Sequence, residues 1–414
     1  MKLLFIHQNF PGQYKYLAPL LALRGHDCTA LTLRVEKPTK WQGVRILPYS
    51  LPKRTGQNVH PWLIDLDSKI TRAEAAFRAA RALRDQGYTP DLILAHPGWG
   101  EALFLRDVWP EARIGLYCEL YHLADEQHLY FDPEFDDSDH DLQALRIRMK
   151  NVHNHLQFGA ADAGISPTEF QADTFPPPFR DKIAICHDGI DIKTACPDPQ
   201  ATFNMEKNVL SRDDEVVTFV NRNLEPYRGY HVFMRALPRL LRERPRAQVL
   251  ILGSDEVSYG AAPPKGQTWK QIFIDEVRAQ IPDEDWARVH FLGRIPYDRF
   301  LRLLQVSRVH VYLTYPFVLS WSLLEAMSCE AAIVASDTAP VREVITDGET
   351  GRLVDFFDQD ALVGQVSALL DDEAERQSLG HAARRLMLER YDLHDVCLPR
   401  QLAWISQVMD GAKI

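Results

Sequence analysis

The chain alternates from end to end between short apolar runs typical of β-strands and longer runs with helical spacing. Such βαβ alternation predicts parallel sheets that are covered by helices on both faces. The helical spacing over Gly12–Arg24, for example, stops at Gly25. Strands are expected at Lys2–His7, Asp91–Ala95, Ala112–Cys118, Ala161–Ile165, Ile183–Cys186, Val216–Val220, Gln248–Leu252, Val289–Leu292, Val309–Leu313 and Ala332–Ala335, and helices at Thr71–Gln86, Leu142–Gly159, Ser322–Ser328 and Glu373 to about Val408.

The length of 414 residues exceeds the roughly 250–300 residues that one hydrophobic core supports. The stretch Phe175–Pro199 interrupts the alternation, since its three consecutive prolines, Pro176 to Pro178, cannot lie inside a helix. We therefore expect two doubly wound, Rossmann-like α/β domains facing each other across a cleft, with the boundary after residue 190. Ligands of such sheets bind at the carboxyl ends of the strands, so the cleft is the expected active site.

Composition narrows the class of protein. The net charge of −10 argues against a nucleic-acid partner. No apolar run approaches the roughly 20 residues of a membrane helix, and the first residues are too short an apolar stretch for a signal peptide. The six cysteines are scattered without a CxxC pair, which indicates buried free thiols. We therefore expect a cytoplasmic protein.

Several nucleotide and metal motifs are missing. GxGxxG does not follow the first strand, and neither GxxxxGK[ST] nor HExxH occurs, which argues against an NAD enzyme and a P-loop NTPase. The triplets Asp65-Leu66-Asp67 and Asp137-Ser138-Asp139 resemble a metal-binding DxD. This short pattern is common by chance among 57 acidic residues, so we predict no metal site.

The most informative stretch is Pro316–Met327, directly after the strand Val309–Leu313. Ser320 and Ser322 suit the first turn of a helix, whose free N–H groups and dipole would favour a diphosphate. Glu325, one turn further, could accept hydrogen bonds from ribose hydroxyls. A plain strand–loop–helix unit with a solvated Glu325 is the alternative on this local pattern.

With its continuation, this stretch resembles the C-terminal domain of the family-4 retaining GT-B glycosyltransferases, whose usual form is E-x7-E followed by G-x-x-G-x-L-V. The likeness extends over nearly the whole chain. The matching segments are Ala332–Ile345 and Asp347–Val354, Phe219–Arg222 with Arg228-Gly229 ("GR…KG"), Ile185–Asp191 ("PNGVD"), Asp91–His96 ("DVVHAH") and Ala163–Ser166.

The resemblance implies a GT-B fold with an acceptor domain at 1–190 and a nucleotide-sugar domain at 191–391. A C-terminal helix at about 392–414 would cross back to the first domain. It also implies transfer of a sugar, with retention, from a UDP- or GDP-linked donor to a glycan, a lipid-linked or another hydroxyl acceptor. Metal and cofactor would not be needed, since positioning and fixed charges support front-face attack.

Residue by residue, the resemblance assigns Arg222 and Arg228 to the donor diphosphate, as catalytic cations. Glu325 would bind the ribose. Eight positions earlier, Phe317 replaces the glutamate that contacts the donor sugar in the family, so main-chain groups of Val318–Trp321 are expected to serve instead. The full expected donor set is Gly12, Val318, Leu319, Ser320, Trp321, Ser322, Leu323 and Glu325.

In the first domain, the resemblance places the loop around Gly12 beside the diphosphate and the acceptor. Where the family often has a catalytic histidine after the strand Ala112–Cys118, this sequence has Glu119, with His122 three residues later. Either residue could take that role. The expected acceptor pocket contains His7, Asn9 and His96, and an aromatic segment shapes the pocket or packs between the domains: Tyr121, His122, Tyr130, Phe131 and Phe135.

Three alternatives remain open at this point. Phe317 would suit a non-catalytic sugar-nucleotide-binding protein, and another GT-B enzyme, such as a nucleotide-sugar epimerase or a phosphorylase, would share the fold. A metal-dependent GT-A transferase would use Asp65 or Asp67. The segment Leu142–Leu156, with its Arg146, Arg148 and Lys150, is either an ordinary helix or a peripheral contact with an anionic membrane.

Overall fold

The computed structural model describes residues 1–52, 59–124, 129–136, 139–206 and 208–412. Its contacts divide the chain into two compact units. Unit 1 comprises Met1–Glu126, Asp137–Asp188 and His394–Ile414, and unit 2 comprises Gln127–Asp136 and Gly189–Leu393. The sequence assigns residues 127–136 to the first domain, whereas in the structure their described part packs within unit 2.

Unit 1 is built on a sheet whose strands, in the described part of the chain, follow the order β3-β4-β2-β1-β5-β6-β7-β8. Only β3 runs antiparallel to its neighbour among these pairs. The direction of winding reverses between β1 and β5, and such a switch point is where α/β sheets bind ligands. The strands are β1 Lys2–Ile6, β2 Asp27–Thr32, β3 Thr39–Trp41, β4 Val44–Pro48, β5 Leu92–Ala95, β6 Arg113–Tyr117, β7 Ala163–Ser166 and β8 Ile183–Ile185.

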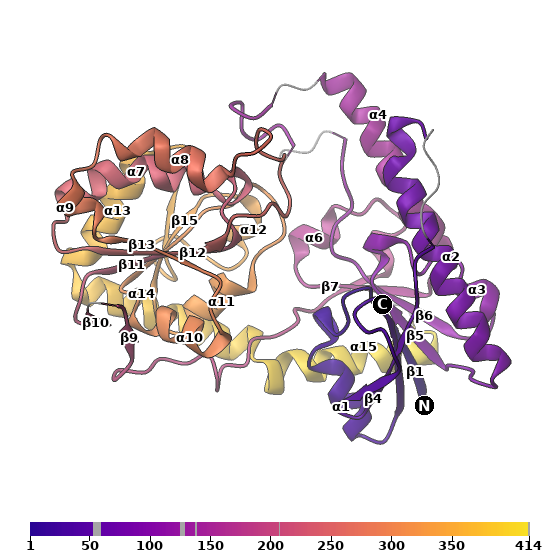
Figure 1. Cartoon of the computed structure of the whole chain (residues 1–414). Coiled ribbons are helices and arrows are strands. Elements are labelled where there is room, and N and C mark those ends of the chain that lie inside the picture. The colour runs from indigo at the N-terminus through magenta and orange to yellow at the C-terminus, as the bar shows by residue number, and fades with distance from the viewer. Residues whose placement is uncertain (53–58, 125–128, 137–138, 207, 413–414) are drawn as a thin grey trace. The chain divides into compact units, whose positions relative to one another are not determined.

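Helices cover both faces of this sheet (Figure 1). A Cβ added to Gly115 of β6 would lie 2.6 Å from the ring of Trp404, so glycine at this position lets α15 pack closely on the sheet. The expected helix Leu142–Gly159 is divided at Asn151 into α4 and α5. The helices of unit 1 are α1 Leu17–Leu23, α2 Ile64–Asp85, α3 Leu105–Val108, α4 His140–Lys150, α5 Val152–Ala160, α6 Glu169–Asp173 and α15 Leu398–Asp410.

Unit 2 repeats the plan with a parallel sheet in the order β13-β12-β11-β14-β15-β16 and its switch point between β11 and β14. Its strands are β11 Val216–Asn223, β12 Gln248–Ser254, β13 Val289–Gly293, β14 Val309–Tyr312, β15 Ala332–Ser336 and β16 Arg352–Val354, beside the hairpin β9 Thr202–Asn204 and β10 Val209–Ser211.

One helical layer of unit 2 contains α7, α8 and α13, and the other contains α10, α11 and α14 (Figure 1). The bounds are α7 Tyr230–Glu243, α8 Trp269–Arg278, α9 Asp283–Trp286, α10 Tyr297–Val306, α11 Trp321–Ser328, α12 Ala339–Arg342, α13 Gln359–Asp371 and α14 Glu373–Leu386. The uninterrupted helix expected from Glu373 onwards instead passes through two π-helical turns, Met387–Tyr391 and Leu393–Cys397, separated by Asp392.

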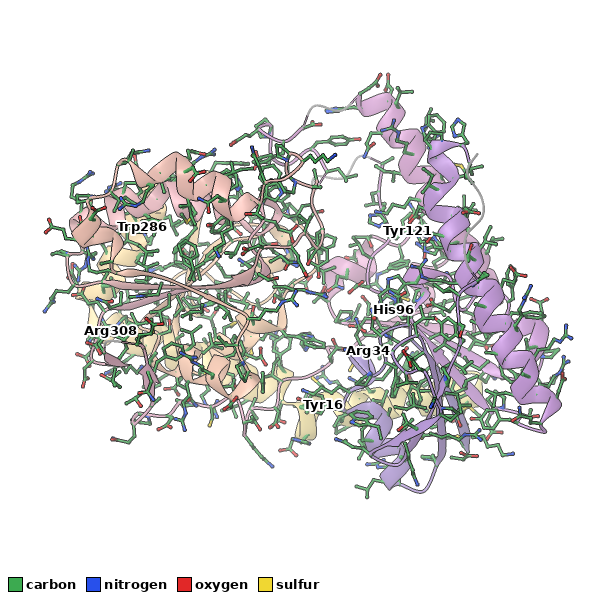
Figure 2. All side chains as sticks on the ribbon, in the orientation of Figure 1. Tyr16, Arg34, His96, Tyr121, Trp286 and Arg308 are labelled. Atoms are coloured by element: carbon green, nitrogen blue, oxygen red, sulfur yellow. The ribbon has the colours of Figure 1, made fainter. Side chains whose placement is uncertain are left out.

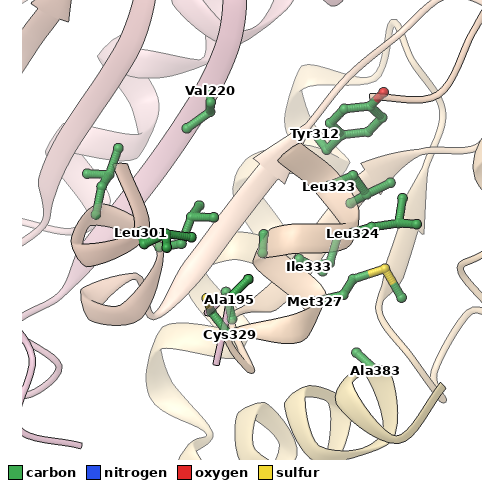
Figure 3. Close-up of a cluster of buried hydrophobic side chains, with 14 of the residues drawn as sticks. Ala195, Val220, Leu301, Tyr312, Leu323, Leu324, Met327, Cys329, Ile333 and Ala383 are labelled. Atoms are coloured by element: carbon green, nitrogen blue, oxygen red, sulfur yellow. The ribbon is translucent and has the colours of Figure 1, made fainter. Parts of the chain in front are cut away.

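Burial fixes the position of α11. Leu323, Leu324 and Met327 are fully buried in a cluster with Ile333 and Ala383 (Figure 3). Burial of one such side chain is worth about 1.5–3 kcal/mol, so this face of α11 is firmly held. The amino end of α11 is thereby placed just beyond β14, at the switch point of the sheet. Among the described residues, no helix has both the length and the apolar composition needed to cross a bilayer.

Candidate active site

Three polar side chains of unit 1 follow the carboxyl ends of adjacent strands. His7 follows β1, His96 follows β5 and Glu119 lies two residues beyond β6. The His7 and His96 rings are 5.4 Å apart, and Glu119 Oε2 lies 3.5 Å from His96 Nε2, outside hydrogen-bonding geometry. Trp99, which the sequence did not single out, stacks on His96 at 4.3 Å. Figure 2 labels His96 within this part of unit 1.

His7 is held as a neutral imidazole. Its Nδ1 accepts a hydrogen bond from the main-chain N–H of Asn9 at 3.0 Å, which leaves the ring proton on Nε2, 2.8 Å from Gln13 Oε1. Burial, reinforced by the nearby His96, lowers the pKa of His7 to about 3. Gly12 folds over this ring with a φ of +48°, and a Cβ there would lie 2.4 Å from Nε2. Glycine is therefore required at position 12.

Glu119 and His122, the two alternatives for one catalytic role, have different surroundings. The Glu119 side chain is 41% exposed and faces His96. His122 is placed through its main chain, which bonds to the amide of Asn151 at the junction of α4 and α5. The structure thus brings Glu119, rather than His122, to the group formed by His7 and His96.

Arg228 ends a short 3-10 turn after β11 and is only 6% exposed. Its Nη1 donates to Thr314 Oγ1 at 2.8 Å and to the Val318 carbonyl at 3.0 Å, which fastens the loop after β14. The rings of Tyr259 and Phe317 lie 5.1 and 5.6 Å from the guanidinium carbon. No described carboxylate forms an ion pair with Arg228. A buried cation without a counter-ion is costly, so this site favours an anionic ligand.

Two further polar residues lie shortly before Arg228 in the chain. Arg222 is exposed near the end of β11, where the strand register shifts between Val220 and Asn223. Glu225, which the sequence did not single out, is buried and accepts hydrogen bonds from the main-chain N–H groups of residues 258–260 at 3.2–3.3 Å. These bonds hold Tyr259 against Arg228.

The amino end of α11 is capped by Ser320, whose Oγ accepts from the N–H of Ser322 at 3.3 Å. The N–H of Ser320 donates to the buried Tyr312 hydroxyl at 3.0 Å. Trp321 is 43% exposed. The Leu319 and Leu323 side chains belong to the hydrophobic core, so only their main-chain groups can face a ligand.

Two predicted donor positions have aromatic neighbours. Glu325 accepts a 2.6 Å hydrogen bond from Tyr297, the first residue of α10, which the sequence did not indicate. Phe317 is buried, with its ring 5.1 Å from Tyr227 and 5.0 Å from Tyr259. It therefore forms part of the aromatic surroundings of Arg228.

The segment Phe131–Phe135 is anchored on unit 2 by its aromatic and acidic side chains. Asp132 Oδ2 accepts a 2.7 Å bond from Tyr315 and lies 2.9 Å from His231 Nε2. Phe131 packs on Tyr315, Phe356 and Phe357, and Phe135 packs on His231, Trp269 and Phe273.

Within the described residues, Asp132, Glu134 and His231 are the group that comes close enough to share a metal ion. Arg235 already forms a two-point ion pair with Glu134, at 2.6 and 2.7 Å. Tyr315 already donates to Asp132. These internal cations and donors meet the needs of both carboxylates without a metal ion.

Comparison with known proteins identifies the family of the chain. Residues 24–195 match the family model described as Glycosyl transferase family 4 group, and residues 200–386 match that of Glycosyl transferases group 1. The chain belongs to the group 1 glycosyltransferases. This glycosyltransferase is 30% identical over 208 residues to the phosphatidyl-myo-inositol mannosyltransferase of Mycolicibacterium smegmatis, a match that spans 49% of the chain and about half (47%) of the relative.

A longer match relates the glycosyltransferase to the D-inositol 3-phosphate glycosyltransferase of Corynebacterium efficiens, with 24% identity over 88% of this chain and 82% of the relative. Among solved structures, the sucrose-phosphate synthase of Thermosynechococcus elongatus superposes with a TM-score of 0.75 at 17% identity, covering 98% of each chain. The fold is therefore GT-B.

The alternative of a GT-A transferase is wrong. Of its expected metal ligands, Asp65 and Asp67 lie in the first turn of α2, where Asp65 pairs with Lys69 at 2.8 Å. Asp137 and Ser138 lie outside the described residues, and Asp139 caps α4.

Proposed function

We propose that this glycosyltransferase moves a sugar, with retention of anomeric configuration and without a metal, from a UDP- or GDP-linked donor to a hydroxyl acceptor. The main support for the assignment of the donor site is the environment of Arg228. Its guanidinium is buried at the switch point of unit 2, held by neutral oxygens and aromatic rings, and has no carboxylate partner among the described residues. A diphosphate supplies the missing negative charge.

Departure of the nucleoside diphosphate develops negative charge on the leaving oxygen. Arg228 and Arg222 stabilise that charge, and the positive end of the α11 helix dipole adds to the field. Glu325, oriented by Tyr297, accepts hydrogen bonds from the ribose. The acceptor hydroxyl attacks from the face that the diphosphate leaves, and a leaving-group oxygen takes its proton.

For the acceptor, support comes from unit 1. Glu119 presents a half-exposed carboxylate, which accepts hydrogen bonds from hydroxyl groups, and the buried His96 ring, stacked on Trp99, lies 3.5 Å behind it. The two relatives are named for phosphatidyl-myo-inositol and D-inositol 3-phosphate, a phospholipid and a polyol phosphate. We propose a lipid-linked or glycan hydroxyl as the acceptor, and a cytoplasmic enzyme that contacts the membrane through the basic residues of α4, Arg146, Arg148 and Lys150.

A thermal-shift screen against UDP-, GDP-, ADP- and CMP-sugars tests the donor, because ligand binding to the native state raises the melting temperature. We expect a shift with a UDP- or GDP-sugar that persists in EDTA and is lost in Arg228→Ala. Arg246→Ala, which removes an 81% exposed arginine of the same unit, is the matched control. Equal shifts in the Arg228 and Arg246 variants would contradict the assignment.

Transfer itself is tested by release of free nucleotide with acceptor present. Conversion of the donor without any acceptor would indicate an epimerase. Binding of the donor without nucleotide release under any acceptor would favour the non-catalytic alternative.

A further inference from the structure

Unit 2 contains a second hollow, at the amino ends of β14 and β15 and thus at the opposite edge of the sheet from Arg228. Two adjoining cavities of about 260 and 290 Å³ share Arg212 and Glu330 in their walls. Arg308 directly precedes β14, and Arg376 lies in the first turn of α14. Three arginines from separate segments therefore line one hollow.

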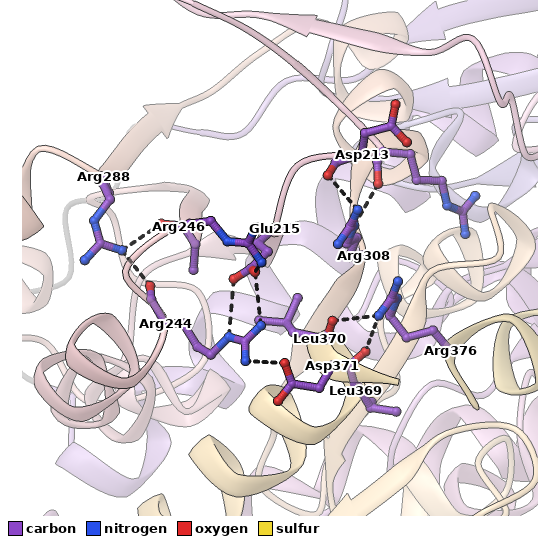
Figure 4. A network of polar contacts seen from close by, with 12 residues as sticks. Asp213, Glu215, Arg244, Arg246, Arg288, Arg308, Leu369, Leu370, Asp371 and Arg376 are labelled. Atoms are coloured by element: carbon purple, nitrogen blue, oxygen red, sulfur yellow. Dashed lines mark hydrogen bonds and ion pairs between the residues drawn. The ribbon is translucent and has the colours of Figure 1, made fainter. Parts of the chain in front are cut away.

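Main-chain carbonyls hold these three guanidinium groups in place, and Figure 4 shows the bonds of Arg308 and Arg376. Arg308 donates to the carbonyls of Arg212 and Asp213 at 2.8 and 2.6 Å. Arg376 donates to those of Leu369 and Leu370 at 2.6 and 2.8 Å. Arg212 donates to the carbonyl of Glu330. Each guanidinium has five N–H donors, so each keeps further donors after these bonds.

Arginines nearby behave differently. Arg244 and Arg246 pair with Glu215 at 3.0 and 2.7 Å, and Arg288 pairs with Asp285 at 2.7 Å. By contrast, none of the three cavity arginines forms an ion pair with a carboxylate in the part of the chain that the structure describes.

The three positive charges also act on one another. Burial lowers the pKa of the Arg212 and Arg376 guanidinium groups, and the positive charge of Arg308 lowers both as well. Glu330 acts against this effect at Arg212, and Glu373 acts against it at Arg376. Clustered cations that no carboxylate pairs with directly, on the wall of a cavity, are stabilised by a bound anion.

The remaining wall is polar and acidic. Asp213, Glu330, Glu373 and Gln377 line the same hollow, and none of the three carboxylates forms an ion pair with the three arginines in the described part of the chain. Carboxylates and amides of this kind accept hydrogen bonds from hydroxyl groups. The lining therefore combines donors for a phosphate with acceptors for a polyol.

We propose that this cavity binds a phosphate ester of a sugar or polyol, with Arg212, Arg308 and Arg376 on the phosphate and Glu330 and Glu373 on the hydroxyls. The site is separate from the donor site of the proposed function and does not depend on it. The phosphate ester is either a free metabolite or the headgroup of a lipid.

Calorimetric titration with glucose 6-phosphate, inorganic phosphate and glucose tests the proposal. Glucose 6-phosphate should bind more tightly than inorganic phosphate, and glucose alone should not bind. Arg376→Gln should weaken glucose 6-phosphate binding by about tenfold or more, since it removes a charged donor. Arg246→Gln, outside the cavity, should leave it unchanged. Equal affinity in the Arg376 and Arg246 variants overturns the proposal.

A second variant tests the proposal even if Arg376→Gln does not fold. Glu373 is exposed at the start of α14, so Glu373→Gln disturbs the fold little. Loss of its negative charge should strengthen binding of inorganic phosphate by about threefold, a gain that a merely structural role does not predict. Unchanged or weaker phosphate binding in Glu373→Gln overturns the proposal.

Vesicles distinguish the two sources of the phosphate ester. Flotation with vesicles of phosphatidylcholine plus phosphatidylinositol 4-phosphate, lost in Arg376→Gln, assigns a lipid headgroup. Binding of glucose 6-phosphate without flotation assigns a free metabolite. If neither binds, the proposal is wrong.

Discussion

The hydroxyl of Tyr315 donates a 2.7 Å hydrogen bond to Asp132 Oδ2, and the same Tyr315 ring lies 4.7 Å from Tyr227, the residue before Arg228. The segment Phe131–Phe135 is therefore joined, through one side chain, to the loop that Arg228 holds. This relationship makes Asp132 and Tyr315 positioning residues for the proposed donor site.

Tyr315→Phe keeps the aromatic packing and removes only the hydroxyl. We expect the free energy of unfolding to fall by about 1–3 kcal/mol, because a buried carboxylate loses a donor. Nucleotide affinity should fall a few-fold as the loop loosens. Denaturant unfolding of Tyr315→Phe, Asp132→Asn and the double variant measures the coupling. Strictly additive losses would show that the two residues do not act as a pair.

Asp132 should make stability depend on pH in the acid range. Burial alone would raise the pKa of Asp132, but the nearby His231 and the hydrogen bond from Tyr315 hold it below its ordinary value. The stabilisation of the fold by ionised Asp132 is therefore complete above the pKa of the unfolded chain, about 3.9. It is lost as pH falls through the lower pKa of the folded protein. Melting temperatures of wild type and Asp132→Asn should differ at pH 7 and converge below about pH 4.

His7 affects a different pH window. Its pKa falls from 6.5 to about 3 on folding, so the unfolded chain binds a proton that the folded one rejects. The contribution of neutral His7 to the free energy of unfolding is complete above pH 6.5 and declines as pH falls from 6.5 towards 3. In His7→Asn, the free energy of unfolding should fall less steeply between pH 6.5 and 4, because unfolding then takes up about one proton fewer. A curve parallel to that of wild type would mean that His7 is not held neutral.

Substitution of Glu325 should raise the donor KM more than substitution of Tyr297. Glu325→Ala removes the ribose acceptor and should raise the donor KM by about tenfold or more. Tyr297→Phe leaves the carboxylate but removes the 2.6 Å bond that orients it, so we expect about a threefold rise. Steady-state kinetics with varied donor measures both. A larger effect from Tyr297→Phe than from Glu325→Ala would contradict these roles.

Phe317→Glu introduces the acid that the family usually has at this position. In this structure the new carboxylate would lie beside Arg228, pair with it and compete with the diphosphate. We therefore expect nucleotide affinity to fall by about tenfold. Phe317→Leu is the control for packing. Tighter donor binding in Phe317→Glu would place position 317 at the sugar rather than at the arginine.

Much of the fold follows from local pattern. Apolar runs in the sequence predict the strands β1, β5 and β11. The turns after these strands contain residues that are expected at the site. The sequence pattern does not predict the strands β2 and β4. Their short runs lie close together, and β4 ends in a proline, Pro48, which hides the pattern.

Contacts between residues far apart in the chain were beyond sequence reasoning. Asp132 meets Tyr315 across 183 residues, and no local period encodes such a pair. The same holds for Arg228, whose charge suggests phosphate binding but whose bonds to Thr314 and Val318 appear only in the folded unit. The break at Asn151 likewise depends on its side chain reaching His122.

The packing of Trp404 against Gly115 sets an order of assembly during synthesis. Unit 1 needs α15 to cover β6, whereas all of unit 2 precedes α15 in the chain. On the ribosome, the first sheet therefore waits with one face incomplete while the second unit folds. Unit 1 is therefore begun before unit 2 and completed after it, and the apolar face under α15 is the surface that a chaperone would protect in the meantime.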